Sequence, residues 1–145
     1  MDGANASTTG VRQMVPLLNV ADIATSAGFY VDGLGFRMTR QWAPDGVLRW
    51  CWLEVGDAAL MIQQSWQEGV GPAPLPTPPG QGVTLCLMCD DALAIWRDVR
   101  GRGLKPDRPF VGNGLWVVSF RDPDGYRIDF ESPTDVAEET VYAGD

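Results

Sequence analysis

Histidine is absent from this chain of 145 residues. Its absence removes the commonest general base and the commonest metal ligand at once. Ser-His-Asp and Cys-His catalysis therefore cannot operate within this chain. Any acid–base chemistry built on this chain alone would have to use carboxylates.

Positive charge and long apolar runs are also scarce. Acidic residues outnumber basic residues 19 to 11, which gives a net charge of −8. A phosphate backbone or an anionic membrane surface would be repelled, so neither nucleic acid nor membrane is expected as a partner. The apolar runs are far shorter than the roughly 18 residues of a membrane helix. Residues 1–10 lack the apolar stretch of a signal peptide. Together these absences predict a cytoplasmic protein.

Cysteine is rare, with only Cys51, Cys86 and Cys89 in the chain. The number is too small and odd for a disulfide scaffold, and each cysteine lies in an apolar run. We therefore expect buried free thiols in a reducing compartment. Cys86 and Cys89 match a C-x-x-C pattern, but residues three apart on a strand point to opposite faces. A shared metal or disulfide between these two is not expected.

Composition divides the chain into two modules of one structural domain. Hydrophobic residues make up 45% and charged residues 21%, proportions typical of a chain that buries its own core. Proline removes sheet donors, so the segment with five prolines and four glycines is predicted to be a linker. The predicted order is a disordered lead-in at 1–11, a module at 12–67, the linker at 68–82, a second module at 83–133 and an acidic tail at 134–145.

Each module is predicted to run strand, helix, strand, strand, strand, which makes the fold class α+β. The expected strands of the first module are 14–20, 36–43, 48–55 and 58–64, with a helix capped by Asp22 and ended by Gly33 and Gly35. The second module is expected to have strands at 83–89, 115–121 and 126–131, an extended segment at 104–110, and a helix capped by Asp90 or Asp91.

The two modules form an internal repeat with an offset of 68 or 69 positions. One such unit cannot bury both its helix and the opposite sheet face, so two units should combine. The matching pairs are Asp22 with Asp91, Gly35 with Gly103, and Met61 with Asp129.

The repeated βαβββ order and four short motifs resemble the vicinal oxygen chelate superfamily, which includes glyoxalase I, extradiol dioxygenases, fosfomycin-resistance enzymes and bleomycin-resistance proteins. The motifs are VAD at 20–22, FY at 29–30, GLGF at 33–36 and DPDGY at 122–126. The resemblance implies two modules that form a curled mixed sheet around a U-shaped cavity, with the helices on the outer face. It also implies a homodimer, which would cover exposed sheet edges.

The resemblance implies metal ligands on four strands of the metal-dependent members. The corresponding positions in this chain are Val15, Met61, Thr84 and Asp129. One carboxylate and one hydroxyl remain, whereas a divalent metal needs several hard or borderline ligands. No metal and no cofactor are therefore expected, and the metal-free bleomycin-resistance type is the nearest in kind.

Strand alternation predicts which side chains face the cavity. Trp50, Trp52 and Glu54 share one strand face, and Cys51 and Leu53 share the other, which suits packing under a helix. Two indoles on a concave face form a stacking platform for a flat or cationic ligand. The alternative, that both indoles only fill the cavity or a dimer interface, stays open.

The same alternation predicts further ligand-binding positions in an apolar pocket with a few polar anchors. Asp129 among Trp and Met side chains would need a cationic partner, either a ligand amine or Arg121 or Arg127. The carboxylates of the turn at 122–125 are expected to be solvated. The candidate ligand-binding residues are Asn19, Trp50, Trp52, Met61, Gln63, Cys86, Met88, Ser119 and Asp129.

Three functions fit these observations. The resemblance implies a metal-free protein that binds a small molecule, sequestering an aromatic or cationic compound as antibiotic-resistance members do. The alternative is a lyase, isomerase or dioxygenase-like enzyme of the same superfamily, with Asp129 or Glu54 as base or with a non-standard metal site. In the third, the pocket serves only to pack a dimer.

Overall fold

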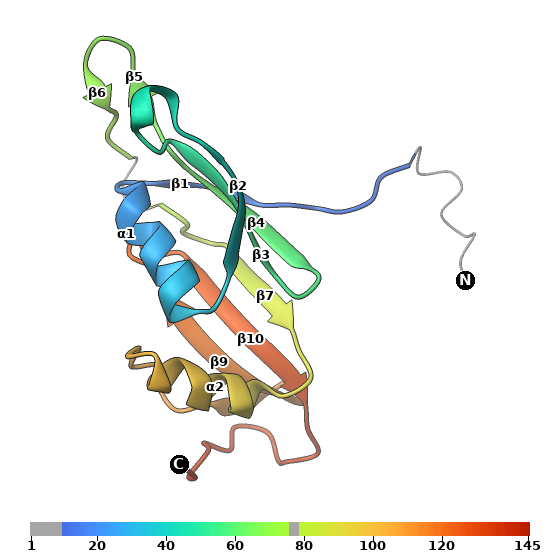
Figure 1. The fold of residues 1–145 in the computed structure, drawn as a ribbon. Helices are drawn as coiled ribbons and strands as arrows, with labels where there is room; N and C mark the ends of the chain where they lie inside the picture. Colours follow the sequence, from blue (N-terminus) through green and yellow to red (C-terminus); the bar gives the residue numbers. More distant parts are fainter. Residues whose placement is uncertain (1–9, 76–78) are drawn as a thin grey trace.

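The computed structural model describes residues 10–75 and 79–145, so most of the lead-in expected at 1–11 lies outside the described residues. The first module has a short β-strand, a short α-helix that continues into a π-helical turn, and a three-stranded meander (Figure 1). Its elements are β1 (Leu17–Val20), α1 (Ile23–Gly28), η2 (Phe29–Gly33), β2 (Arg37–Trp42), η3 (Pro44–Gly46), β3 (Trp50–Val55) and β4 (Ala58–Gln64).

The second module repeats this order after a small hairpin. Hydrogen bonds arrange the strands as β1-β4-β3-β2 in one four-stranded sheet and as β7-β10-β9-β8 in the other, so the two sheets have the same topology. This arrangement confirms the α+β class. No described helix has the length and apolar character needed to span a membrane. The elements are β5 (Trp66–Gln67), β6 (Gly71–Pro72), β7 (Thr84–Met88), α2 (Ala92–Gly101), β8 (Phe110–Gly112), β9 (Leu115–Arg121) and β10 (Arg127–Pro133).

Both helices begin at the aspartates that the repeat pairs. The Asp22 carboxylate accepts hydrogen bonds from the backbone N–H groups of Ala24 and Thr25, and Asp91 accepts one from Ala94. These bonds satisfy donors that a helix leaves unpaired in its first turn. The expected N-caps are therefore present in both modules.

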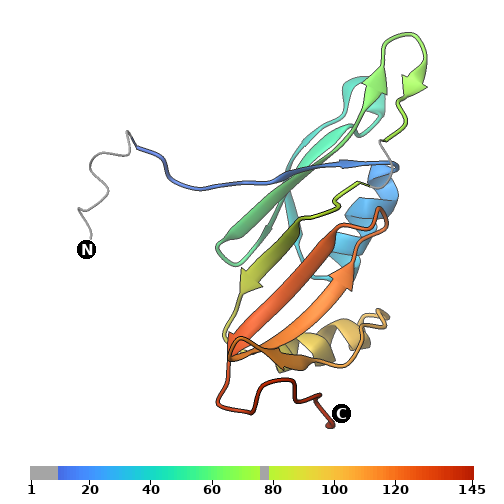
Figure 2. The same ribbon diagram turned by 180° about the vertical axis from the view of Figure 1, so that it is seen from behind.

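Both helices cover the same side of the two sheets, and their apolar faces build one core. Figure 1 shows the helices in front of the strands, and Figure 2 shows the sheets in front. Cys51 and Leu53 are fully buried, as strand alternation predicts. Ile128 occupies the matching face of the second sheet, and Tyr30 and Trp96 bring the two helices into the same cluster. The opposite faces of the two sheets carry no helix, and we call them the concave faces.

A buried carboxylate joins the modules. Asp122 is 4% exposed and accepts a 2.8 Å hydrogen bond from the Tyr30 hydroxyl, 92 residues away in the chain. The same carboxylate accepts bonds of 2.9 Å from the backbone N–H groups of Asp124 and Tyr126. The expectation that the carboxylates of this turn are solvated is therefore wrong, because a tyrosine of the other module covers the turn.

Neighbouring residues of this turn extend the contact between the modules. Asp124 accepts hydrogen bonds from the Ala21 backbone N–H at 3.0 Å and from the Ser26 hydroxyl at 3.2 Å. Tyr126 donates its hydroxyl proton to the Asn19 carbonyl at 2.9 Å. The DPDGY turn thus holds the start of the first module through four side-chain contacts, Tyr30 included.

The segment expected to be a linker and the acidic tail, for which no structure was predicted, are both ordered in part. The proline-rich segment begins with a small hairpin, β5 with β6, whereas residues 76–78 lie outside the described residues. The acidic tail packs on the second module, where Val141 bridges Phe110 and Tyr142 makes edge contacts with Trp96 and Trp116. Aromatic packing, which the charge of the tail does not reveal, holds it in place.

Replacing Tyr30 with Phe removes a donor from a buried carboxylate. We expect the free energy of unfolding to fall by about 1–3 kcal/mol at neutral pH. Burial raises the pKa of Asp122, and the bond from Tyr30 opposes that rise. Because the pKa of Asp122 is raised in the folded state, the free energy of unfolding increases as the pH falls through that pKa. The variant, which lacks the Tyr30 hydroxyl, should have a still higher pKa at Asp122. Chemical denaturation at neutral and acidic pH should therefore show the deficit shrinking in acid.

Tyr142→Phe is the control for this measurement. It loses a hydroxyl that only accepts a bond from the exposed Arg97. If Tyr30→Phe lowered the free energy of unfolding by the same amount at both pH values, the result would contradict the assigned role of the Asp122 carboxylate.

Candidate functional site

The concave face of the first sheet carries two cross-strand rows of side chains. Strand register places the side chains of each row directly opposite one another. The rows contain five of the candidate ligand-binding residues together with three other residues. Gln63 donates its amide to Asn19 at 2.8 Å, which fixes both amides. One row is Trp42, Trp50, Gln63 and Asn19, and the next is Arg40, Trp52, Met61 and Leu17.

Trp52 is held by its own neighbours. Its indole N–H donates to Glu54 at 2.7 Å, and the Arg40 guanidinium lies 4.3 Å from the ring centroid. Glu54 also accepts a 3.0 Å bond from the Thr39 hydroxyl. The ring of Trp52 is therefore covered by Arg40, and the Glu54 carboxylate, a candidate base, is engaged by two donors.

Trp50 borders an open groove of about 680 Å³ at the end of this sheet. Its walls come from the first module and the small hairpin: Trp42 and Arg49 lie on one part of the wall, and Gln63 and Trp66 on another. Sequence reasoning missed Trp42, Arg49 and Trp66. Trp42 was detectable in principle, because the hairpin between the predicted strands pairs it with Trp50.

The second sheet has a polar concave face. Ser119, Asp129 and Cys86 lie opposite one another in one row. Asp129 is 4% exposed, and both of its oxygens accept bonds from Arg127, at 3.0 and 3.2 Å. Arg127 also donates to the Ser119 hydroxyl at 3.1 Å. The cationic partner expected for Asp129 is thus Arg127, one of the two arginines considered.

Two other placements complete the candidate residues of this sheet. Met88 is 62% exposed at the end of β7. Cys86 is exposed as well, which corrects the expectation of three buried thiols. Cys89 packs against the core, and Cys51 is buried, so that burial raises the pKa of its thiol to about 11. The thiols of Cys86 and Cys89 therefore lie in different environments.

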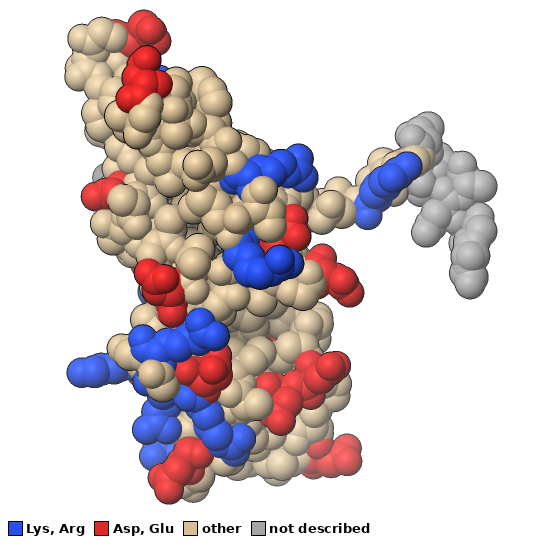
Figure 3. Space-filling view, in the orientation of Figure 1, with Lys and Arg blue, Asp and Glu red and all other residues tan. Residues whose placement is uncertain are grey.

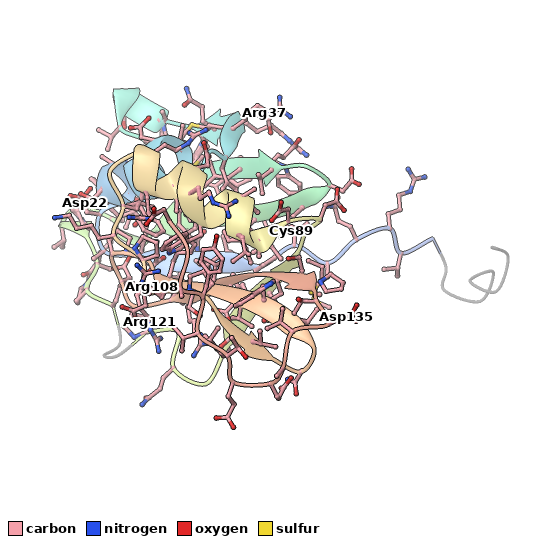
Figure 4. The ribbon with its side chains drawn as sticks, turned by 90° about the horizontal axis from the view of Figure 1, so that it is seen from below. Asp22, Arg37, Cys89, Arg108, Arg121 and Asp135 are labelled. Atoms are coloured by element: carbon pink, nitrogen blue, oxygen red, sulfur yellow. The ribbon has the colours of Figure 1, made fainter. Side chains whose placement is uncertain are left out.

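Positive charge gathers on the second module despite the acidic composition. Figure 3 shows lysine and arginine side chains clustered over the region of α2. A cleft of about 650 Å³ beside Ser119 is lined in part by Arg108 and Arg121, which Figure 4 labels, and by Lys105. This cleft and the groove at Trp50 share no lining residue. The site residues predicted from the sequence therefore divide into two sets, one on each sheet.

A sequence model of the Glyoxalase/Bleomycin resistance protein/Dioxygenase superfamily matches residues 12–130. The chain belongs to this superfamily. A lactoylglutathione lyase of Haemophilus influenzae is 31% identical over an alignment of 120 residues that covers 79% of this chain and 87% of the relative. The resemblance drawn from the sequence motifs is thereby confirmed.

Solved structures share the fold. TnmS3, an antibiotic binding protein from Streptomyces sp. CB03234, superposes with a TM-score of 0.64 at 23% identity, covering 86% of this chain and 98% of its own. A bleomycin resistance determinant encoded on the transposon Tn5 gives a TM-score of 0.63 at 23% identity, covering 87% of this chain and all of its own (100%).

The metal-ligand positions of the superfamily do not fit a metal in this chain. Val15 and Met61 supply no oxygen or nitrogen from their side chains, and Thr84 supplies only a hydroxyl. The remaining carboxylate, Asp129, has both oxygens bonded to the Arg127 guanidinium. A cation therefore already neutralises the one strong donor of the set.

Another group of potential ligands lies beside that carboxylate. The ligand atoms of Cys86, Asp129 and Glu131 lie within 4.8 Å of one another. Burial, Glu131 and Asp129, in that order, raise the pKa of the Cys86 thiol, which favours its protonated, non-ligating form. The Arg127 charge competes with any metal cation for the same carboxylate.

Replacing Arg127 with Met should make this group available to a metal. We expect wild-type protein to take up no stoichiometric Co²⁺ after dialysis, because Arg127 already neutralises Asp129. The variant should bind Co²⁺ with a thiolate charge-transfer band. Arg121→Met is the matched control, since Arg121 lies opposite Arg127 but donates to the Gly125 carbonyl. Stoichiometric metal in the wild type would contradict this interpretation.

Proposed function

We propose that this protein is a metal-free small-molecule-binding protein that holds an aromatic compound on the concave face of its first sheet. The observation that carries the proposal is the row of Trp42, Trp50, Gln63 and Asn19 beside an open groove of about 680 Å³. Indole rings offer large, rigid contact area, and the fixed amides offer oriented polar contacts.

The state of the two candidate bases favours binding over catalysis. Glu54 accepts from Trp52 and Thr39, and Asp129 is paired with Arg127. A general base must have a lone pair within reach of the substrate proton. Both oxygens of Asp129 are bonded to Arg127, and one oxygen of Glu54 accepts both of its bonds while Arg37 lies 4.0 Å from the other. Binding needs no such free lone pair.

The comparisons support both the proposal and its alternative. TnmS3 is described as an antibiotic binding protein and the Tn5 protein as a bleomycin resistance determinant, which suits sequestration of a compound. The relative from Haemophilus influenzae is described as a lactoylglutathione lyase, which suits an enzyme. The specific observation in favour of an enzyme is the group of Cys86, Asp129 and Glu131. The ion pair between Arg127 and Asp129 argues against an enzyme, because Arg127 neutralises the carboxylate at the centre of that group.

We also propose that the protein is a homodimer in the cell cytoplasm. Leu17 is 43% and Met88 62% exposed on the concave faces, and the groove and the cleft are open to solvent in one chain. A second copy laid over these faces would bury the apolar side chains and enclose the groove.

Replacing Trp50 with Ala tests the binding role. The probes are three naphthalene compounds of different charge: 2-naphthoate, 2-naphthylmethanol and 2-naphthylmethylammonium. We expect calorimetry to show that the variant binds the best of these probes about 1–3 kcal/mol more weakly than the wild type, with its melting temperature nearly unchanged. Trp116→Ala is the control, because Trp116 contacts Tyr142 in the second module.

A purely structural role of Trp50 gives a different result. The free energy of unfolding would then fall by about 3–5 kcal/mol, as for a core tryptophan, while probe affinity stays the same. If no probe binds the wild type, the proposed binding function fails.

Sedimentation equilibrium tests the dimer. We expect a species of twice the 15.8 kDa chain mass at micromolar concentration. Met88→Glu should shift the protein to the monomer, because a charge would be buried without a partner. Val136→Glu, at a position 42% exposed on the tail, should leave the dimer intact. A monomeric wild type would contradict the proposal.

A further inference from the structure

Among the described residues that line the groove beside Trp50, Arg49 is the cation, and hydrogen bonds of its backbone fix its position in the sheet. The Arg49 backbone N–H donates to the Trp42 carbonyl at 3.0 Å, and the Arg49 carbonyl accepts from the Gln64 N–H at 2.9 Å. These bonds continue the hydrogen-bond ladders of β3 with β2 and with β4 to the residue before the first residue of β3. Arg49 therefore sits on a rigid part of the first sheet rather than on a free loop.

The Arg49 guanidinium lies between two indole rings. Its central carbon is 4.2 Å from the ring centroid of Trp66 and 5.8 Å from that of Trp42. Stacking on indoles uses the faces of the guanidinium plane and leaves its N–H edge available. None of the hydrogen bonds found among the described residues includes this guanidinium.

Those donors have no partner in the described part of the chain. The Arg49 Nε atom is buried and makes no hydrogen bond, the one such side-chain atom found among the described residues. None of the ion pairs found among the described residues includes Arg49. A buried donor without an acceptor is costly, and a bound ligand is one source of the missing acceptor. Five other arginines donate to protein acceptors, namely Arg97, Arg102, Arg108, Arg121 and Arg127.

We propose that this groove selects a planar aromatic anion, an aryl carboxylate, whose carboxylate accepts hydrogen bonds from Arg49 while its ring lies against Trp50. The inference rests on the proposed binding function and names the ligand class for that same groove. A carboxylate matches the flat fork of a guanidinium, and an aromatic ring matches the indoles that line the groove. The Gln63 amide lines the same groove and offers a polar contact to ring substituents.

This ligand class differs from the one that net charge alone suggests. The charge of −8 favours a cationic ligand at long range. Two charged residues line the groove: Arg49 is half-buried, whereas Glu68 is exposed to solvent, which screens its charge. Coulomb energy falls with distance and with screening by salt, so the nearby cation decides which ligand is held.

The experiment uses the three naphthalene probes on the full-length protein. In wild-type protein 2-naphthoate should bind about 10- to 100-fold more tightly than 2-naphthylmethanol, the scale of a charged hydrogen bond, and the ammonium probe should bind most weakly. Arg49→Gln should reduce the ratio of 2-naphthoate affinity to alcohol affinity to about one. Arg49→Lys keeps the charge without the fork and should retain part of the preference.

Arg100→Gln is the matched control. Arg100 also stacks on an indole, with its central carbon 4.2 Å from the ring centroid of Trp96, but it belongs to the second module. This variant should keep the wild-type order of probe affinities. The control separates loss of the groove cation from loss of one positive charge in general.

Two results would overturn the inference while sparing the proposed function. One is equal or tighter binding of the ammonium probe by the wild type. The other is an unchanged preference for 2-naphthoate in Arg49→Gln. Absence of binding by every probe would instead overturn the proposed function and this inference with it.

Discussion

The buried carboxylate of Asp122 is the constraint on which the rest of the structure depends. It lies at the turn between β9 and β10, where two backbone N–H groups and the Tyr30 hydroxyl bond to it. The bonds to the backbone fix the turn and, with it, the register that sets Asp129 opposite Ser119. The bond to Tyr30 ties that turn to the helical segment of the other module. One charged group thus couples local hairpin geometry to the packing of the two halves.

The two modules share a topology but present different chemistry on their concave faces. The first has tryptophans and fixed amides, and at its end lies an arginine for which the described residues provide no acceptor. The second has an arginine, a serine and an aspartate that satisfy one another. A duplicated framework therefore separates an aromatic face with one amide pair from a face whose charged and hydroxyl groups are bonded to one another.

The sequence predicts the fold well because its strongest signals are local. Alternation along β3 places Cys51 in the core and Trp50 on the concave face, and aspartate caps locate both helices. The errors concern contacts distant in sequence. Burial of Asp122 depends on Tyr30, which no local pattern of the turn reveals.

The groove was only partly predictable for a similar reason. Trp50 follows from alternation, but Trp66 reaches the groove through a small hairpin inside a proline-rich segment that looks like a linker. The role of Arg49 depends on the positions of both neighbouring indoles and on the absence of an acceptor in the described residues. Neither the positions of these indoles nor the absence of an acceptor can be predicted from Arg49 and its immediate neighbours in the sequence.

The last residues of the chain lie along the outer strand of the second sheet. The Val111 N–H donates to the Thr140 carbonyl, the Glu139 N–H donates to the Val111 carbonyl, and the Tyr142 N–H donates to the Pro109 carbonyl. An outer strand with unpaired backbone groups is a template for strand-to-strand aggregation. By occupying those groups, the tail protects this edge and keeps the second sheet from pairing with a strand of a neighbouring molecule.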